Sequence, residues 1–260
     1  MADWALILGA SSGFGEAVSL ELASRGLNIL GVHLDRKATL ANAERIQKEI
    51  EAKKVQGVFY NINAADAEKR AEVIADAKKR LGPGENIRVL FPSLAFGTLK
   101  PLVTPDGGDQ VSQPQLEMTL DVMANSLVYW TQDVVRSGLM GRHGRVYAMT
   151  SSGGTRVWPQ YGPVSAAKAA LESHCRQLAL ELSKSGVSVN AIRAGVTDTP
   201  ALRKIPGSDE MLEIARKRNP SGRLTTPQDV AKAVGVLIDP ATQWLTGNTL
   251  GVDGGEDIVG

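Results

Sequence analysis

Short apolar segments alternate with longer segments of helical periodicity along the whole chain of 260 residues. The apolar segments of strand length are residues 5–8, 27–32, 55–61, 87–91, 144–149, 187–192 and 249–252. The periodic segments predict helices over residues 16–24, 40–52, 67–81, 115–137, 165–183 and 228–238. Nearly all-apolar strands separated by helices are typical of a parallel sheet that is covered on both faces. We therefore predict an α/β fold: a doubly wound, parallel, seven-stranded sheet in a single domain over residues 1–260.

Composition and charge argue against several classes of protein. Lys and Arg total 29 against 28 for Asp and Glu, so the chain lacks the basic surface expected for nucleic acid or an anionic membrane. No apolar stretch approaches the roughly 18 residues of a membrane helix, and residues 1–4 do not resemble a signal peptide, so we expect a cytoplasmic protein. The lone Cys175 has no partner for a disulfide or a zinc site, and its helical spacing predicts a core position. We expect no metal.

A glycine-rich turn, residues 9–15, lies between the first predicted strand and the first helix. Glycines at such a turn let the backbone reverse tightly, let a pyrophosphate approach the amides and let the helix pack closely on the sheet. The N-terminus of the helix adds unpaired N–H groups and partial positive charge. A tight turn alone explains many glycine clusters, but this position favours nucleotide binding by Gly9, Ser11, Ser12, Gly13, Phe14 and Gly15.

The turn resembles that of the short-chain dehydrogenase/reductase family, and later segments agree with the family in order over nearly the whole chain. The matching segments are Asn63-Ala64, Ser93-Leu94-Ala95, Ser151, and residues 189–195, 219–223 and 252–255. The resemblance implies a Rossmann-type domain that binds a nicotinamide dinucleotide. It places Asn63 and Ala64 near the adenine. The other cofactor contacts that it implies are Ser93, Leu94, Ala95, Gly195, Val196, Thr197 and Thr199.

The end of the second strand bears on which nucleotide binds. An acidic residue there bonds the ribose 2′-hydroxyl and repels a 2′-phosphate. The family's usual position for this acid falls on His33, and Leu34-Asp35-Arg36-Lys37 follows. Asp35 can reach the ribose and favour NADH, whereas Arg36 and Lys37, helped by His33, can hold a 2′-phosphate. A solvated loop explains Lys37 equally well. The balance favours NADPH, with NADH as the alternative.

The family's usual Tyr-x3-Lys pair is absent, because Val164 lies four residues before Lys168. The nearest tyrosine is Tyr161, seven residues before the lysine. Seven residues of helix return within about 20° of the starting direction and rise about 10.5 Å, so both side chains can share one face. Pro163 can begin a helix, which places Tyr161 on the preceding turn.

The Tyr-x6-Lys spacing resembles the enoyl-acyl-carrier-protein reductase branch of the family. Residues 92–96 and 194–199 are similar to that branch, and Met123 stands where carbonyl-reducing relatives carry an asparagine. Ser151 departs from it, because many of these reductases have a second tyrosine there. A smaller subgroup shares the serine-rich segment, and the chain looks closest to that subgroup.

The resemblance implies reduction of a trans-2-enoyl thioester by NAD(P)H in fatty acid synthesis. Tyr161 and Lys168 are the implied catalytic residues, and Ser151 or Ser152 assists. It also implies a substrate on acyl carrier protein, a lid at about residues 198–220 and a homotetramer. Basic residues of that lid can meet an acidic carrier, although a solvated helix face explains them equally well.

Two alternatives stay open. The first is a carbonyl or alcohol dehydrogenase, acting on a 3-ketoacyl thioester or another ketone, in which Ser151 works with Tyr161. It is favoured because Ser151 lies seventeen residues before Lys168, at the catalytic serine position of carbonyl-reducing relatives. The second is a nucleotide-binding regulator whose catalytic register has decayed.

Overall fold

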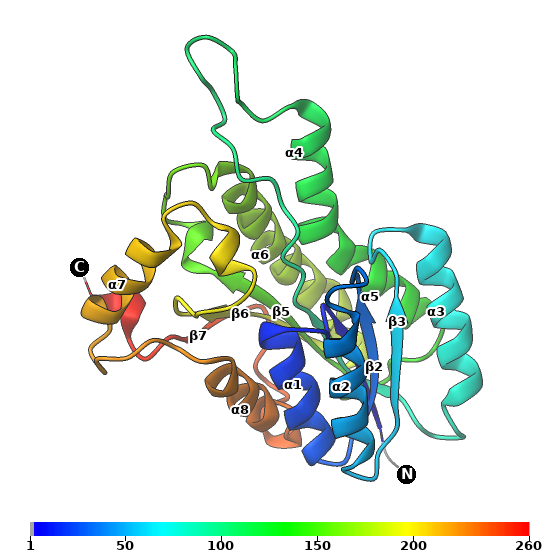
Figure 1. Cartoon of the computed structure of the whole chain (residues 1–260). Helices are drawn as coiled ribbons and strands as arrows, with labels where there is room; N and C mark the ends of the chain where they lie inside the picture. The colour runs from blue at the N-terminus through cyan, green and yellow to red at the C-terminus, as the bar shows by residue number, and fades with distance from the viewer. Residues whose placement is uncertain (1–2, 260) are drawn as a thin grey trace.

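The computed structural model describes residues 3–259 and contains one sheet in the strand order β3-β2-β1-β4-β5-β6-β7 (Figure 1). Every neighbouring pair of strands is parallel. The strands are β1 (Trp4–Leu8), β2 (Asn28–His33), β3 (Gly57–Asn61), β4 (Ile87–Pro92), β5 (Arg145–Ser151), β6 (Ser188–Ala194) and β7 (Thr249–Val252). Their ends differ by at most two residues from the predicted segments. The predicted doubly wound, seven-stranded α/β fold is confirmed.

Helices cover both faces of the sheet. They are α1 (Gly13–Ser24), α2 (Leu40–Glu51), α3 (Ala67–Arg80), α4 (Gln113–Leu120), α5 (Ser126–Arg136), α6 (Gly162–Leu182), α7 (Ser208–Arg218) and α8 (Pro227–Leu237). Helices α1, α2 and α8 pack on one face, and α3, α5 and α6 pack on the other. Strand β1 shows the alternation that this requires: Trp4, Leu6 and Leu8 enter one core, while Ala5 and Ile7 enter the other.

Cys175 is 1% exposed, which confirms its predicted core position. Trp130, Leu171 and Leu178 also pack inside the chain, so their apolar character does not need a partner subunit. Leu180 is different, since 70% of it is exposed. Among the described residues, no helix has both the length and the apolar character needed to cross a membrane.

The predicted single helix over residues 115–137 is wrong in one respect. Helix α4 and helix α5 are separated by a π-helical turn, Asp121–Asn125, in which the backbone hydrogen bonds span five residues instead of the four of an α-helix. Periodicity did not reveal the turn because the apolar positions on both sides still face the core. The turn places Val122 and Met123 at the wall of the cavity described below.

Two further boundaries differ from the sequence-based expectation. Helix α1 begins at Gly13 rather than near residue 16, and α6 begins at Gly162 rather than near residue 165.

Helix α7 lies within the charged segment 198–220, where the periodicity predicts no helix. Its buried residues are only Leu212 and Ala215, so its apolar stripe is too narrow to stand out in the sequence.

Candidate active site

The strand order reverses between β1 and β4, and the main cavity opens at the carboxyl ends of these strands. Crevices of open α/β sheets form at this switch point, because the connections from neighbouring strands leave toward opposite faces. The cavity has a volume of about 1,270 Å³. It extends from the end of β2 to the start of α6, and so has room for a dinucleotide and a second molecule beside it.

The glycine-rich turn forms one wall of the cavity. Gly9 has a φ of +86°, and a Cβ added there would lie 2.4 Å from the carbonyl oxygen of Ser93. Only glycine therefore allows the turns after β1 and β4 to come this close. Gly13 also has positive φ, and Ser12, the residue that precedes α1, makes no side-chain cap. The first N–H groups of α1 are thus free to receive an anionic group.

Nearly all of the sequence-predicted site residues line this one cavity. They are Gly9, Ser11, Ser12, Gly13, Phe14, His33, Asp35, Arg36, Asn63, Ala64, Ser93, Leu94, Ala95, Ser151, Tyr161, Lys168, Gly195, Val196, Thr197 and Thr199. The exceptions are Lys37, which is exposed and does not line the cavity, and Gly15, which is buried under the turn. A Cβ at Gly15 would lie 2.0 Å from the carbonyl oxygen of Gly9, so this glycine closes the turn rather than lining the cavity.

Tyr161 lies at the N-terminus of α6, on the residue before its first turn, as the position of Pro163 predicts. Its ring is packed over Gly153 and Ser151, since a Cβ at Gly153 would lie 2.5 Å from Tyr161 Cε1 and 3.2 Å from Ser151 Oγ. The Ser151 hydroxyl is buried and has no hydrogen-bond partner of normal geometry among the described residues. Burial raises the pKa of Tyr161, and the nearby Ser151 hydroxyl offsets part of that rise.

Lys168 is 7% exposed, and its Nζ donates to the carbonyl oxygen of Met149 at 2.7 Å. Desolvation lowers the pKa of this lysine to about 8, although the charge of Glu172 acts in the opposite direction. Glu172, one turn further along α6, accepts a hydrogen bond of 2.7 Å from Thr150 Oγ1. Two hydrogen bonds, from Lys168 to Met149 and from Thr150 to Glu172, therefore connect the end of β5 to α6.

The far end of the cavity is apolar. Met123 and Val164 occupy the two positions at which carbonyl-reducing relatives would carry asparagine and tyrosine, and both line this end. The remaining apolar walls come from the loop after β4 and from the segment 198–220: Phe96, Leu99, Leu202, Ile205, Met211 and Ile214. An unbranched apolar chain fits such a wall better than a polar or charged substrate.

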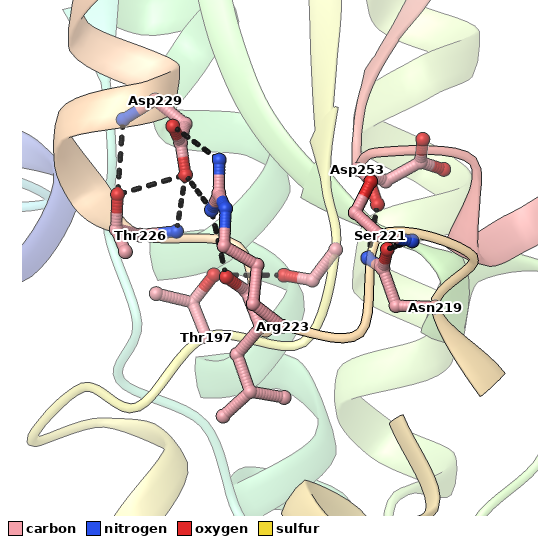
Figure 2. A network of polar contacts seen from close by, with 9 residues as sticks. Thr197, Asn219, Ser221, Arg223, Thr226, Asp229 and Asp253 are labelled. Atoms are coloured by element: carbon pink, nitrogen blue, oxygen red, sulfur yellow. Dashed lines mark hydrogen bonds and ion pairs between the residues drawn. The ribbon is translucent and has the colours of Figure 1, made fainter. Parts of the chain in front are cut away.

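Polar contacts lie within and around the turn after β6, residues 195–199 (Figure 2). Thr197 Oγ1 donates to the carbonyl oxygen of Gly195 at 2.9 Å, inside the turn. Arg223 makes two hydrogen bonds, of 2.6 and 3.0 Å, to the carboxylate of Asp229 at the start of α8. Asn219 Nδ2 donates to the carbonyl oxygen of Asp253 at 2.8 Å. The last bond brings the segments 219–223 and 252–255 together near the turn, since a Cβ added at Gly195 would lie 3.2 Å from Asp253 Cα.

The sequence did not point to three residues that complete this wall: Arg156, Glu256 and Asp257. Glu256 is 6% exposed and accepts the backbone N–H of Val196 at 3.0 Å. Burial raises its pKa. Asp257 pairs with Arg156 at 3.0 Å and with Arg193 at 3.0 Å. The glycine pair Gly254-Gly255, which has positive φ in the structure, indicates a turn just before the two carboxylates. The sequence does not indicate which part of the cavity that turn approaches.

The segment 198–220 lies over the apolar end of the cavity. Trp158 Nε1 donates to the carbonyl oxygen of Pro206 at 3.1 Å, which joins the loop after β5 to the segment. Gly207 has a φ of +76°, and a Cβ there would lie 3.4 Å from the Trp158 ring. Arg203 pairs with Asp198 and Asp209 at 2.5 and 2.6 Å and so stiffens the segment internally.

The fold and the cavity define the short-chain dehydrogenase/reductase class of oxidoreductases. The family model described as enoyl-(acyl carrier protein) reductase matches residues 9–256, and the chain belongs to this family. It is therefore an NAD(P)H-dependent oxidoreductase. The uncapped N-terminus of α1, the close turn at Gly9, the positive φ of Gly13 and the unpartnered Ser151 hydroxyl all fit a nicotinamide dinucleotide.

Similar proteins include enzymes named for two different reactions. A 1-cyclohexenylcarbonyl-CoA reductase of Streptomyces collinus is 29% identical over 98% of this chain and 86% of its own length. A 3-oxoacyl-[acyl-carrier-protein] reductase of Pseudomonas aeruginosa is also 29% identical, over 96% of both chains. The crystal structure of an NADH-dependent enoyl-[acyl-carrier-protein] reductase from Aquifex aeolicus superimposes with a TM-score of 0.86 at 23% identity, over 99% and 97% of the chains, which shows the shared fold.

Proposed function

We propose that the chain reduces the carbon–carbon double bond of a trans-2-enoyl thioester with NAD(P)H. The observation that carries this proposal is the position of Tyr161. Its ring lies over Ser151 at the start of α6, in the same cavity as Lys168, whereas the position four residues before the lysine is the apolar and buried Val164. The hydroxyl therefore meets the substrate from a different point on the cavity wall than a Tyr-x3-Lys hydroxyl would.

The chain's own residues then have defined roles. When bound, the reduced nicotinamide supplies a hydride to the β-carbon of the enoyl group, and a proton at the α-carbon completes the reduction. Negative charge develops on the thioester oxygen, and Tyr161 stabilises it by donating a hydrogen bond. Its raised pKa keeps the hydroxyl protonated, as a donor must be. Lys168 positions the cofactor ribose and supports the supply of protons, and Ser151 assists Tyr161.

The relatives' names support both this reaction and its main alternative. The Streptomyces relative is named for a thioester whose double bond is conjugated to the carbonyl. The Pseudomonas relative is named for a 3-oxoacyl substrate. Reduction of a ketone stays the second candidate because Ser151 lies seventeen residues before Lys168, and its unpartnered hydroxyl faces the ring of Tyr161. The regulator hypothesis is weaker, since the cavity retains both a buried lysine and a tyrosine at its wall.

The test is a panel of thioesters with purified protein. We expect oxidation of NADH or NADPH with crotonyl thioester, on coenzyme A or on acyl carrier protein, at least tenfold faster than with acetoacetyl thioester. Activity restricted to the ketone would overturn the proposal in favour of the second candidate. Inertness toward both thioesters, with cofactor binding intact, would favour the regulator.

We also propose a single domain with a lid at about residues 198–220, a substrate on acyl carrier protein and a homotetramer. Trp158 and Arg203 support the lid, because they hold this segment over the apolar end of the cavity. Lys204 and Arg218 line the cavity and place positive charge near its mouth, where an acidic carrier would approach. The preference for NADPH stays a prediction.

A further inference from the structure

A glutamate on α6 lies beside the candidate catalytic lysine, and the proposed reaction assigns it no role. Glu172 follows Lys168 by four residues, so the two side chains share one face of the helix. Both lie against the turn Ser152–Gly154, because a Cβ added at Gly154 would lie 3.3 Å from Glu172 Oε1 and 3.6 Å from Lys168 Cβ. The carboxylate and the stem of the lysine are therefore neighbours under the same short piece of backbone.

Thr150 connects this glutamate to the cavity. Thr150 is 4% exposed and lines the cavity, whereas Glu172 does not line it. It follows Ala148 by two residues on β5, so its side chain points to the sheet face that α6 covers. Its hydroxyl donates to Glu172 Oε1 at 2.7 Å, which is the one hydrogen bond that this carboxylate receives from a side chain among residues 3–259. A neutral donor thus holds the charge of Glu172 against the end of β5.

Lys168 has few partners for a buried cation. Its Nζ donates to the carbonyl oxygen of Met149 and makes no ion pair with any residue between 3 and 259. A buried ammonium group without an ion pair is costly, and a negative charge nearby reduces that cost. Glu172 is the carboxylate whose charge acts on Lys168, in the direction opposite to desolvation.

Three other ionisable groups of α6 and the turn before it are neutral near pH 7. Burial raises the pKa of Tyr161, and it raises that of the Cys175 thiol to about 12. Burial lowers the pKa of His174, whose Nε2 lies 3.2 Å from Asn125 Oδ1 in the π-helical turn. None of the three supplies a negative charge that could offset Lys168 at neutral pH.

The charged groups on the elements packed around α6 have partners of their own. They are Asp121 with Tyr129 in and after the π-helical turn, Glu117 with Gln113 on α4, Asp133 of α5 with Arg70 of α3, and Arg156 and Arg193 with Asp257. None of these groups is among those that shift the pKa of Lys168, whereas Glu172 is. The lysine therefore depends on one carboxylate, one helical turn away.

We propose that Glu172 is a positioning residue: held by Thr150, it keeps Lys168 charged and in place at the end of β5, so that the ammonium group can hold the cofactor ribose. The proposal rests on the proposed function only for the role of Lys168. It goes beyond that function because it makes the charge of the lysine depend on a residue outside the cavity.

The charge of the lysine matters because an ammonium group donates stronger hydrogen bonds than a neutral amine. Desolvation lowers the pKa of Lys168 to about 8, even with the opposing charge of Glu172 in place. Without that charge the pKa would fall further, because the cost of desolvation would be unopposed. The amine would then lose its proton at a lower pH than in the natural protein and would bind the ribose more weakly.

Two variants separate the charge of Glu172 from its hydrogen bond. Glu172→Gln removes the charge, while the new amide oxygen can still accept the hydrogen bond from Thr150. Thr150→Val removes the hydrogen bond and keeps the carboxylate. Glu181→Gln is the matched control, because Glu181 is an exposed carboxylate on the same helix that accepts a hydrogen bond from Gln177.

The first measurement follows the charge of Lys168 directly, in cofactor-free protein that contains ¹³C-labelled lysine. NMR records the ¹³Cε shifts from pH 6 to pH 10, and Lys168→Met identifies the signal by its absence. We expect a midpoint near pH 8 in the natural protein and in Glu181→Gln. The midpoint should fall by about one pH unit in Glu172→Gln, and by a smaller amount in Thr150→Val.

The second measurement is the dissociation constants of NAD⁺ and NADP⁺, by isothermal titration calorimetry without any thioester. Glu172→Gln should bind either nucleotide about threefold more weakly than the natural protein at pH 8. At pH 6 the two proteins should bind equally well, because both then hold the lysine proton. A merely structural role of Glu172 would instead weaken binding by the same factor at both pH values.

The proposal is overturned if the Lys168 midpoint is the same in Glu172→Gln as in Glu181→Gln, or if the loss of nucleotide binding does not depend on pH. Circular dichroism verifies the fold of each variant. If Glu172→Gln does not fold, Thr150→Val decides, and an unchanged midpoint in that variant overturns the proposal.

The outcome is independent of which bond the enzyme reduces, because no thioester is present in either measurement. A failed assay with crotonyl thioester, together with the expected shift of the midpoint and pH-dependent binding, would overturn only the proposed reaction. If neither nucleotide binds the natural protein, the cofactor site is wrongly assigned and the proposal fails with it.

Discussion

At the scale of single residues, the candidate catalytic pair owes its properties to burial. Lys168 is 7% exposed and the Tyr161 ring packs against Gly153, so both ionisable groups are largely shielded from water. Burial opposes the charged form of each group, which lowers the pKa of the lysine and raises that of the tyrosine. The two shifts leave a neutral, hydrogen-bond-donating hydroxyl in the same cavity as an amine that can lose its proton near pH 8.

Tyr161→Phe should lower kcat with crotonyl thioester by about 10²- to 10³-fold, because one donor to the developing oxyanion is lost. The dissociation constant of the nucleotide should change by less than about threefold, since the proposed cofactor contacts lie elsewhere in the cavity. Tyr129→Phe is the matched control, because it removes a hydroxyl that bonds Asp121 outside the cavity. An activity of Tyr161→Phe equal to that of the control would contradict the proposed role.

Lys168→Met should stabilise the cofactor-free protein at pH 7, by about 1–3 kcal/mol in urea unfolding, because a desolvated cation is removed. The folded pKa of about 8 lies below the ordinary lysine value of 10.5, so below pH 8 both states hold the proton and the penalty is complete. Between pH 8 and pH 10.5 only the folded amine loses its proton. The natural protein should therefore gain on the variant as pH rises through that window. A difference that stays constant from pH 7 to pH 10.5 would argue against a desolvated lysine.

Among single residues, those fixed by a motif were predictable from sequence and those fixed by tertiary contact were not. Tyr161 and Lys168 lie on one helix, so their spacing alone indicated a shared cavity. Glu256 and Asp257 reach the turn after β6 from about 60 residues further along the chain, through a turn whose direction depends on Gly254 and Gly255. The role of Asp35 also depends on Asn61 in another strand, so the sequence left the choice of nucleotide open.

At the scale of secondary-structure elements, the C-terminal turn Glu256–Ile258 connects three parts of the cavity wall. Glu256 holds the turn after β6 through Val196, and Asp257 joins Arg193 of β6 to Arg156 in the loop that leads to Tyr161. Arg156 also donates to the carbonyl oxygen of Asp257 at 2.8 Å. The turn Glu256–Ile258 therefore holds the loop between β5 and α6 in position through Arg156.

Asp257→Asn should weaken both ion pairs and lower kcat with the preferred thioester by about tenfold, because small misplacements of a reacting group are costly. The dissociation constant of the nucleotide should stay within about threefold, which separates displaced catalytic groups from a damaged cofactor site. The control is Asp76→Asn, which removes a carboxylate that also has two partners, Tyr60 and Arg80, outside the cavity. Equal kcat values for the two variants would show that the C-terminal turn does not position Tyr161.

Among the elements, strands and helix cores were predictable because their periodicity is a local property. The ends of helices depended on context: α1 includes Gly13 and α6 includes Gly162, residues that a propensity argument leaves in the preceding turn. Helix α7 was missed because its exposed face is charged and its buried face is narrow. Figure 1 shows this helix at the left of the view, apart from the helices that cover the sheet, and only Leu212 and Ala215 of it are buried.

At the scale of the whole molecule, the surface retains apolar side chains that the fold does not cover. Trp244 is 95% exposed and Leu180 is 70% exposed. The two lie in neighbouring segments, because a Cβ added at Gly247 would lie 3.7 Å from Ala179 Cβ. Large exposed apolar groups that gather in one region are typical of protein–protein contacts. The parallel, doubly wound sheet was predictable at this scale from the alternation of elements, whereas the assembly depends on a surface that no sequence pattern marks.

We expect the protein to sediment as a tetramer at micromolar concentration, and Trp244→Glu or Leu180→Glu to shift it toward smaller species. The physical reason is that a carboxylate placed in a buried apolar contact loses its hydration without gaining a partner. Val103→Glu, in the loop after β4 with 79% exposure, is the matched control. Analytical ultracentrifugation that finds a monomer for the natural protein, or no change in either Trp244→Glu or Leu180→Glu, would contradict this assembly.

The π-helical turn Asp121–Asn125 makes the chain tolerant of a length change at one place. Such a turn accommodates one residue more than an α-helix of the same span. Deleting a single residue there would therefore let α4 and α5 join as one continuous α-helix, while the residues on both sides keep their faces. The change would be confined to the turn, which carries Val122 and Met123 of the cavity wall. A deletion inside α4 or α5 would instead turn the residues on one side of it by about 100° relative to those on the other, because a regular α-helix has no extra residue to lose.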